Sequence, residues 1–99
     1  MSTLQIEKYI AKLSTEEGIK ESVLEEKLQK SILKILRNNH SYIFQLLYKY
    51  DVSESKAQLA FKQINDEDIA LALAKLFIER EKQKIYFRKL YSSTTNNEE

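Results

Sequence analysis

The chain contains no proline and no cysteine, and Gly18 is the one glycine among its 99 residues. Without proline, almost nothing along the chain forbids a helix, and with so little glycine the tight turns of β-hairpins lack their usual residues. The composition therefore predicts an all-α fold. The absence of cysteine excludes disulfides, thiolate metal sites and cysteine nucleophiles, and it suits a reducing compartment.

Long apolar runs are also missing. The longest covers residues 69–74, whereas a helix that spans a bilayer needs about 20 apolar residues. Residues 1–13 contain no apolar segment of the kind found in secretory signals. We expect no association with a membrane and a cytoplasmic location.

The balance of residue types is that of one folded domain. Hydrophobic residues make up 42% of the chain and charged residues 31%, which is typical of globular proteins. A chain of this length is one domain by the usual size range of domains. We predict a single helical domain over residues 1–91. The polar tail over residues 92–99 has no apolar side chain to anchor it, so we expect it to be disordered.

Apolar residues recur at three- and four-residue steps, which predicts a compact bundle of about five helices with a long C-terminal helix. The expected ranges are 3–17, 22–37, 41–50, 53–64 and 66–91. Gly18 is expected to stop the first helix as a left-handed residue, with a capping box from Ser22 to Glu25 starting the second. A capping box from Ser14 to Glu17 is the alternative, and it would start the second helix near residue 15.

The three later helices have distinct patterns. The third, SYIFQLLYKY, is apolar nearly all round and is predicted to be the central, buried helix. The fourth is expected to begin at the cap Ser53 and to turn Ile64 inward. The fifth is expected to begin at the cap Asp66, with acidic residues in its first turn and basic residues towards its end.

The end of the last helix combines charge with aromatic rings. Residues 75–91 contain six basic and two acidic side chains, a distribution that complements the helix dipole. The apolar residues point in several directions around the helix, more than one monomer core is expected to bury. This pattern predicts self-association, or the binding of a protein partner, through the C-terminal helix. The candidate interface residues are Phe77, Ile85, Tyr86, Phe87, Leu90 and Tyr91.

The stretch LLYKYDVSESKAQLAFKQI, residues 46–64, resembles the helix-turn-helix signature of DNA-binding regulators. In that family a helix ends in a hydrophobic residue, a tight turn reads glycine, valine, serine, and a recognition helix follows. Residues 50–53 occupy the turn here, and Ala57 and Ala60 hold the inward positions of the next helix. Asp51 replaces the glycine, and aspartate tolerates the left-handed conformation better than most residues. The resemblance implies DNA binding as an alternative function.

Two features count against this alternative. Leu47 stands where the family has a small residue, and residues 51–64 contain as many acids as lysines. The isoelectric point of the whole chain is about 7.9, whereas nucleic-acid-binding domains usually exceed about 9. DNA binding would therefore need the basic ends of the two long helices. The candidate contact residues are Lys56, Gln58, Lys62, Arg80, Lys84 and Arg88.

Residues for catalysis or cofactor binding are scarce. His40 is the single histidine, in a segment read as a turn between helices, and zinc would need three or four donors of suitable type. Phosphate-binding loops need clustered glycines, and the chain has one. The acidic residues stand in first turns or among lysines, where they serve as helix caps and ion pairs. We expect no cofactor, no metal ion and no enzymatic activity.

Overall fold

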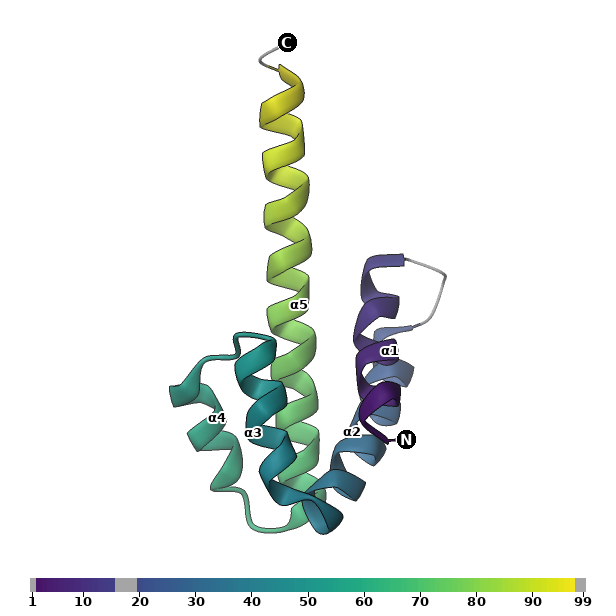
Figure 1. Ribbon diagram of the computed structural model, residues 1–99, viewed down its shortest axis with the longest axis vertical. Coiled ribbons are helices and arrows are strands. Elements are labelled where there is room, and N and C mark those ends of the chain that lie inside the picture. The colour runs from purple at the N-terminus through teal and green to yellow at the C-terminus, as the bar shows by residue number, and fades with distance from the viewer. Residues whose placement is uncertain (1, 16–19, 98–99) are drawn as a thin grey trace.

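The computed structural model describes the backbone of residues 2–15 and 20–97 and the side chains of residues 6–12 and 20–91. These residues form an all-α bundle with a long C-terminal helix, which confirms the predicted fold class (Figure 1). The five helices are α1 (Ser2–Thr15), α2 (Glu21–Asn38), α3 (His40–Lys49), α4 (Glu54–Phe61) and α5 (Asp66–Asn97).

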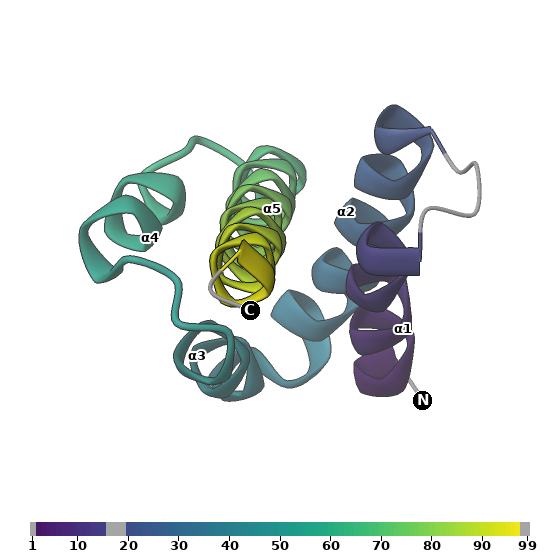
Figure 2. The same ribbon diagram turned by 90° about the horizontal axis from the view of Figure 1, so that it is seen from above.

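The first half of α5 is the centre of the bundle. Seen from above, α5 stands between the α1–α2 pair on one side and α3 and α4 on the other (Figure 2). The most extensive contact is between α2 and α5, while α1 packs on both and α4 packs on α5. The second half of α5 extends beyond the other helices (Figure 1). The radius of gyration is therefore 14.8 Å, above the roughly 13 Å of a compact domain of this length.

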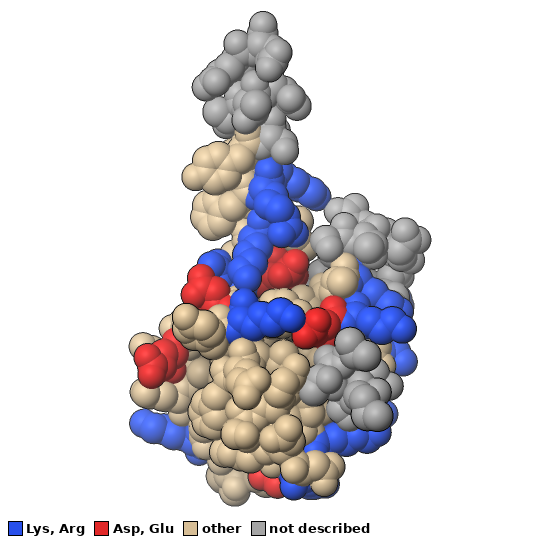
Figure 3. Space-filling view, in the orientation of Figure 1, with Lys and Arg blue, Asp and Glu red and all other residues tan. Residues whose placement is uncertain are grey.

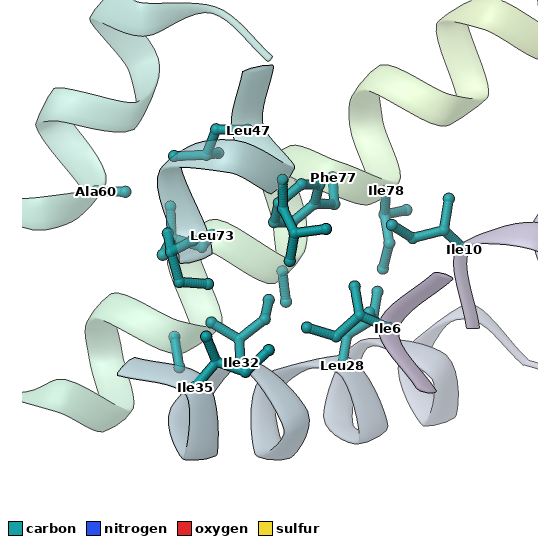
Figure 4. Close-up of a cluster of buried hydrophobic side chains, with 14 of the residues drawn as sticks. Ile6, Ile10, Leu28, Ile32, Ile35, Leu47, Ala60, Leu73, Phe77 and Ile78 are labelled. Carbon is teal, nitrogen blue, oxygen red and sulfur yellow. The ribbon is translucent and has the colours of Figure 1, made fainter. Parts of the chain in front are cut away.

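The core is built from helical stripes at three- and four-residue steps (Figure 4). Leu28 and Ile32 of α2 and Leu73 of α5 are completely buried, and Phe77 of α5 is 1% exposed. Ile6 of α1 closes the core from one side. The remaining buried apolar residues are Ile10, Leu24, Ile35, Ile43, Leu46, Leu47, Ala57, Ala60, Ala70, Ala74 and Ile78.

Polar contacts at both ends mark the antiparallel alignment of α2 and α5. Near the start of α5, Arg37 donates to the carboxylate of Glu67 at 3.2 Å, and Gln29 donates to the Glu67 carbonyl at 3.0 Å. Near the other end of α2, Lys82 donates to Glu21 at 3.0 Å. Each contact is solvent-exposed and adds little energy, since such pairs contribute about 0–1 kcal/mol. Together they show which ends of the two helices meet.

The predicted central position of the third helix is wrong. In α3, Phe44 is 50% exposed and Tyr48 is 90% exposed, whereas Ile43, Leu46 and Leu47 face the core. An all-round apolar pattern marks burial only where neighbouring helices surround it, and α3 lies at the periphery of the bundle (Figure 2). The enclosed helix is the first half of α5.

The caps differ from expectation at two of three helix starts. The Ser53 hydroxyl accepts a hydrogen bond from the Lys56 amide at 3.4 Å, as predicted for the cap of α4. For α5 the cap is Asn65, whose side chain accepts from the Asp68 amide at 2.9 Å, so Asp66 was wrongly chosen. For α2 the preceding residue is Lys20, which makes no side-chain cap bond, so the predicted Ser22 box is absent.

Two helix ends also differ. Helix α4 stops at Phe61, which leaves Ile64 97% exposed in the connection rather than turned inward. Helix α5 continues to Asn97, past the predicted end at residue 91, because the sequence offers no glycine or proline that would stop it. The alternative starts of the second helix involve Gly18 and residues 14–17, and residues 16–19 lie outside the described part of the chain.

Candidate interaction surface

The second half of α5 leaves the hydrophobic core after Ile78. The last fully buried side chain of α5 is Ile78, and every described side chain after it is half-buried or exposed. Its neighbour α2 begins at Glu21, whose carboxylate meets Lys82. Beyond that level α5 projects from the bundle, as its yellow-green part shows in Figure 1.

The projecting half presents four large apolar side chains to solvent. Tyr86, Phe87, Leu90 and Tyr91 are exposed by 62%, 49%, 46% and 71%, and we call this set the aromatic face. Residues 86 and 90, and residues 87 and 91, are four apart, so they form two adjacent rows on one side of the helix. The rings of Tyr86 and Phe87 meet edge to face, with centroids 5.5 Å apart. The rings are therefore partly ordered by each other before any partner binds.

Two of the six predicted interface residues lie elsewhere. Phe77 is 1% exposed and packs edge to face on Tyr50, with ring centroids 5.9 Å apart, so it is a core residue. Ile85 is half-buried, on the side of the helix that continues the core stripe. The structure brings the other four together as the aromatic face.

A groove adjoins the aromatic face. It has a volume of about 780 Å³ and lies between the start of α2 and the outward side of α5. Glu21 and Glu25 line one wall, Ile78 and Glu79 line the α5 side, and the Tyr86 and Phe87 rings close one end. We call it the α2–α5 groove. It shares Tyr86 and Phe87 with the aromatic face, and three carboxylates and two lysines border it.

Three of the six residues proposed for DNA contact are paired with acids. Lys56 lies 3.4 Å from Glu79, Arg80 lies 2.8 Å from Asp51, and Arg88 lies 3.6 Å from Glu81. The Lys84 amine lies over the ring of Tyr50, 5.6 Å from its centroid. Gln58 and Lys62 are exposed on and just after α4. Basic side chains nevertheless follow the projecting half of α5 as a stripe beside uncharged ones (Figure 3).

The turn before α4 has the expected backbone conformation. Asp51 has a φ of 59°, which is the left-handed region, and it is the one described non-glycine residue with positive φ. Its carbonyl and carboxylate both accept hydrogen bonds from Arg80, at 3.0 and 2.8 Å. These two bonds join the turn to α5, and they give the left-handed conformation of Asp51 a structural explanation.

His40 is the first residue of α3 rather than part of a loop. Its ring meets Phe44 edge to face at 5.6 Å and Phe61 at 6.3 Å, and Phe44 stacks on Phe61 at 5.3 Å. Among the side chains that the structure describes, no three histidine, cysteine or acidic residues are grouped for a metal ion. None of the helices in the described ranges is both long and apolar enough to cross a membrane.

Sequence reasoning missed a second exposed apolar surface. Leu59 and Ile64 are exposed by 61% and 97%. Phe44 and Tyr48 are exposed by 50% and 90% and line a hollow between α3 and α4, and we call these two residues the α3–α4 patch. The four-residue step from Phe44 to Tyr48 is the signal that could have separated them from the inward row of α3.

Lys49 and Tyr50, which are neighbours in the chain, both have raised pKa values. Lys49 donates to Glu7 at 2.9 Å, and this hydrogen bond raises the pKa of Lys49 above its ordinary value. Burial raises the pKa of Tyr50, and the negative charge of Glu7 adds to the effect. Both raised pKa values lie far above neutral pH, so neither group is suited to proton transfer at neutral pH.

Comparison of the chain with protein-family models, with curated proteins and with solved structures finds no match.

Proposed function

We propose that this protein acts by binding rather than by catalysis, and that it associates with a second copy of itself through the aromatic face. The observation that supports the proposal is the exposure of Tyr86, Phe87, Leu90 and Tyr91 together on one side of a projecting helix. Large exposed apolar patches on soluble proteins usually mark contact sites, and tyrosine and phenylalanine are enriched in interface cores.

The exposed area is large enough to matter. An aromatic side chain buries about 200 Å² when fully enclosed. With exposed fractions of 62%, 49% and 71%, the three rings leave roughly 360 Å² uncovered in each copy. Covering the rings of two copies would bury about 730 Å², roughly half of the 1,200–2,000 Å² that a specific interface buries, so neighbouring residues of α5 must contribute the rest.

Light scattering coupled to size exclusion tests the proposal. At micromolar concentration we expect a mass of twice the 11.7 kDa of the chain, falling towards one copy on dilution. Phe87→Ser combined with Leu90→Ser is expected to give a monomer. The matched control is Phe44→Ser, since Phe44 is 50% exposed and Phe87 49%, but Phe44 lies in the α3–α4 patch. A monomeric wild-type chain at 100 micromolar would refute the proposal.

DNA binding through residues 46–64 remains the second candidate. The left-handed turn at Asp51 and the basic stripe on α5 favour it (Figure 3). The ion pairs of Lys56, Arg80 and Arg88 count against it, because counterion release needs basic groups that neutralise phosphates instead of carboxylates. If duplex DNA is bound, its retardation in a gel must weaken steeply with added salt. The absence of retardation at low ionic strength excludes this candidate.

A further inference from the structure

The outward side of α5 has a second regular row of residues, opposite the core stripe. Leu76, Glu79, Gln83, Tyr86 and Leu90 follow one another at alternating steps of three and four. This is the spacing at which one helix packs along another in a coiled coil. Leu76 is half-buried and the other four are exposed. We call this row the seam.

The seam is bordered by hollows on both sides. The α2–α5 groove lies on one side, and a smaller hollow of about 220 Å³, lined by Lys56 and Leu76, lies on the other. Glu79 and Gln83 line both hollows, so the seam runs between them. A second helix could pack along this surface, which ends at the aromatic face.

Charge determines the direction of a helix that would pack along the seam. Residues 84–97 of α5 contain three basic side chains and no acid, whereas three carboxylates and two lysines border the groove. Glu21 is paired with Lys82 and Glu79 with Lys56, so among the described side chains of the groove Glu25 is the carboxylate left for a second copy. Two copies with parallel α5 helices would place the basic halves side by side and repel each other. Two copies with antiparallel helices would separate the basic halves and place each one beside Glu25 of the other copy, which is favourable.

This inference rests on the proposed self-association and specifies its geometry. We infer that two copies pair their α5 helices antiparallel along the seam, about a two-fold axis at Gln83. Residues equally far from Gln83 then lie level, so Leu90 of each copy meets Leu76 of the other, and Phe87 meets Glu79. Lys89 lies level with Phe77, beside the wall that contains Glu25. The two Gln83 amides face each other at the axis. The Gln83 amide oxygen accepts a hydrogen bond from Arg80 at 3.2 Å, and its second lone pair and the amide NH2 can serve the other copy.

The pairing of the two Gln83 amides at the axis also favours one register. A polar residue within a helix pair helps to fix alignment, because a shift removes the hydrogen bond between the two copies. An isologous contact of this kind closes on itself, so the expected assembly is a dimer rather than a filament.

Engineered disulfides test the register, because the natural chain contains no cysteine. Gln83→Cys is expected to cross-link two copies under mild oxidation. Leu90→Cys alone is not, because two residues 90 would be about 21 Å apart at 1.5 Å per residue, far beyond disulfide reach. A mixture of Leu76→Cys and Leu90→Cys, with one partner carrying a tag, is expected to give the mixed covalent dimer. Gln58→Cys, exposed on α4, is the control for random collision.

The outcomes separate this inference from the proposed function. If light scattering shows a dimer but Leu90→Cys cross-links as fast as Gln83→Cys, the pairing is parallel and the inference fails while self-association stands. If light scattering shows a dimer and neither the Gln83 variant nor the mixture cross-links faster than the Gln58 control, the copies meet through another surface. If the chain is monomeric, both proposals fail. Circular dichroism of each variant verifies that the helices are intact.

Discussion

Phe77→Ala and Phe87→Ala remove the same side chain from the same helix, ten residues apart, with opposite surroundings. Phe77 is 1% exposed and packs on the ring of Tyr50, whereas Phe87 is 49% exposed on the projecting half of α5. Burial of a ring of about 200 Å² is worth about 5 kcal/mol. Large-to-small substitutions at such sites cost about 3–5 kcal/mol, so we expect a loss of about 4 kcal/mol for Phe77→Ala. For Phe87→Ala in the monomer we expect less than about 1 kcal/mol.

Urea unfolding followed by circular dichroism measures both losses. The protein must be dilute enough to be monomeric, so that association does not contribute to the free energy of unfolding. With a slope of about 2 kcal/mol per molar urea, a loss of about 4 kcal/mol lowers the midpoint by about 2 M. A domain of this size has about 5–15 kcal/mol in total, so Phe77→Ala is expected to leave a marginally folded chain. Equal midpoint shifts for the two variants would refute the assigned core.

Three further changes test local features. Ser53→Ala removes the cap of α4 and is expected to lower the free energy of unfolding by about 1 kcal/mol, measured by thermal melting. Asp51→Ala and Asp51→Gly both remove the carboxylate that pairs with Arg80, but only glycine adopts a φ of 59° without strain. The free energy of unfolding of the alanine variant should therefore be lower than that of the glycine variant by about 1–2 kcal/mol, seen as a lower melting temperature. Equal melting temperatures would contradict this account. Stability should fall as the pH rises above 10.0, the ordinary pKa of tyrosine, and through the raised pKa of Tyr50, because the unfolded chain loses that proton first. The measurement is the fall in the urea midpoint between about pH 9 and pH 11, and Tyr50→Phe should make this fall smaller. A smaller fall should remain, because the pKa of Lys49 is also raised.

Periodicity was sufficient to predict the helices but not their neighbours. The stripe of Leu24, Leu28, Ile32 and Ile35 follows directly from spacing, because a helix with one apolar row must turn that row inward. Helix α3 has apolar residues on every side, and spacing cannot tell which rows will meet another helix. Its exposed rings depend on where α4 and α5 lie, which is a property of the whole bundle.

The exposed aromatic surface was predictable in kind but not in membership. The excess of rings after Arg80 predicted an exposed aromatic surface, and four of six residues form it. Phe77 was wrongly included because the sequence does not show where α5 leaves the bundle. That point depends on the start of α2 at Glu21, forty residues or more away along the chain. The seam required the same knowledge, since its residues are outward only relative to a known core.

The central place of α5 has a consequence for how the chain acquires its structure during synthesis. The apolar stripe of α2 is complete once residue 35 has been made, yet its main partner begins at Asp66. Until that later segment leaves the ribosome, the growing chain exposes the apolar side of α2, which α1 covers only in part. Chaperones that bind apolar segments would meet it in this interval, although helical proteins are usually regarded as fast, local folders.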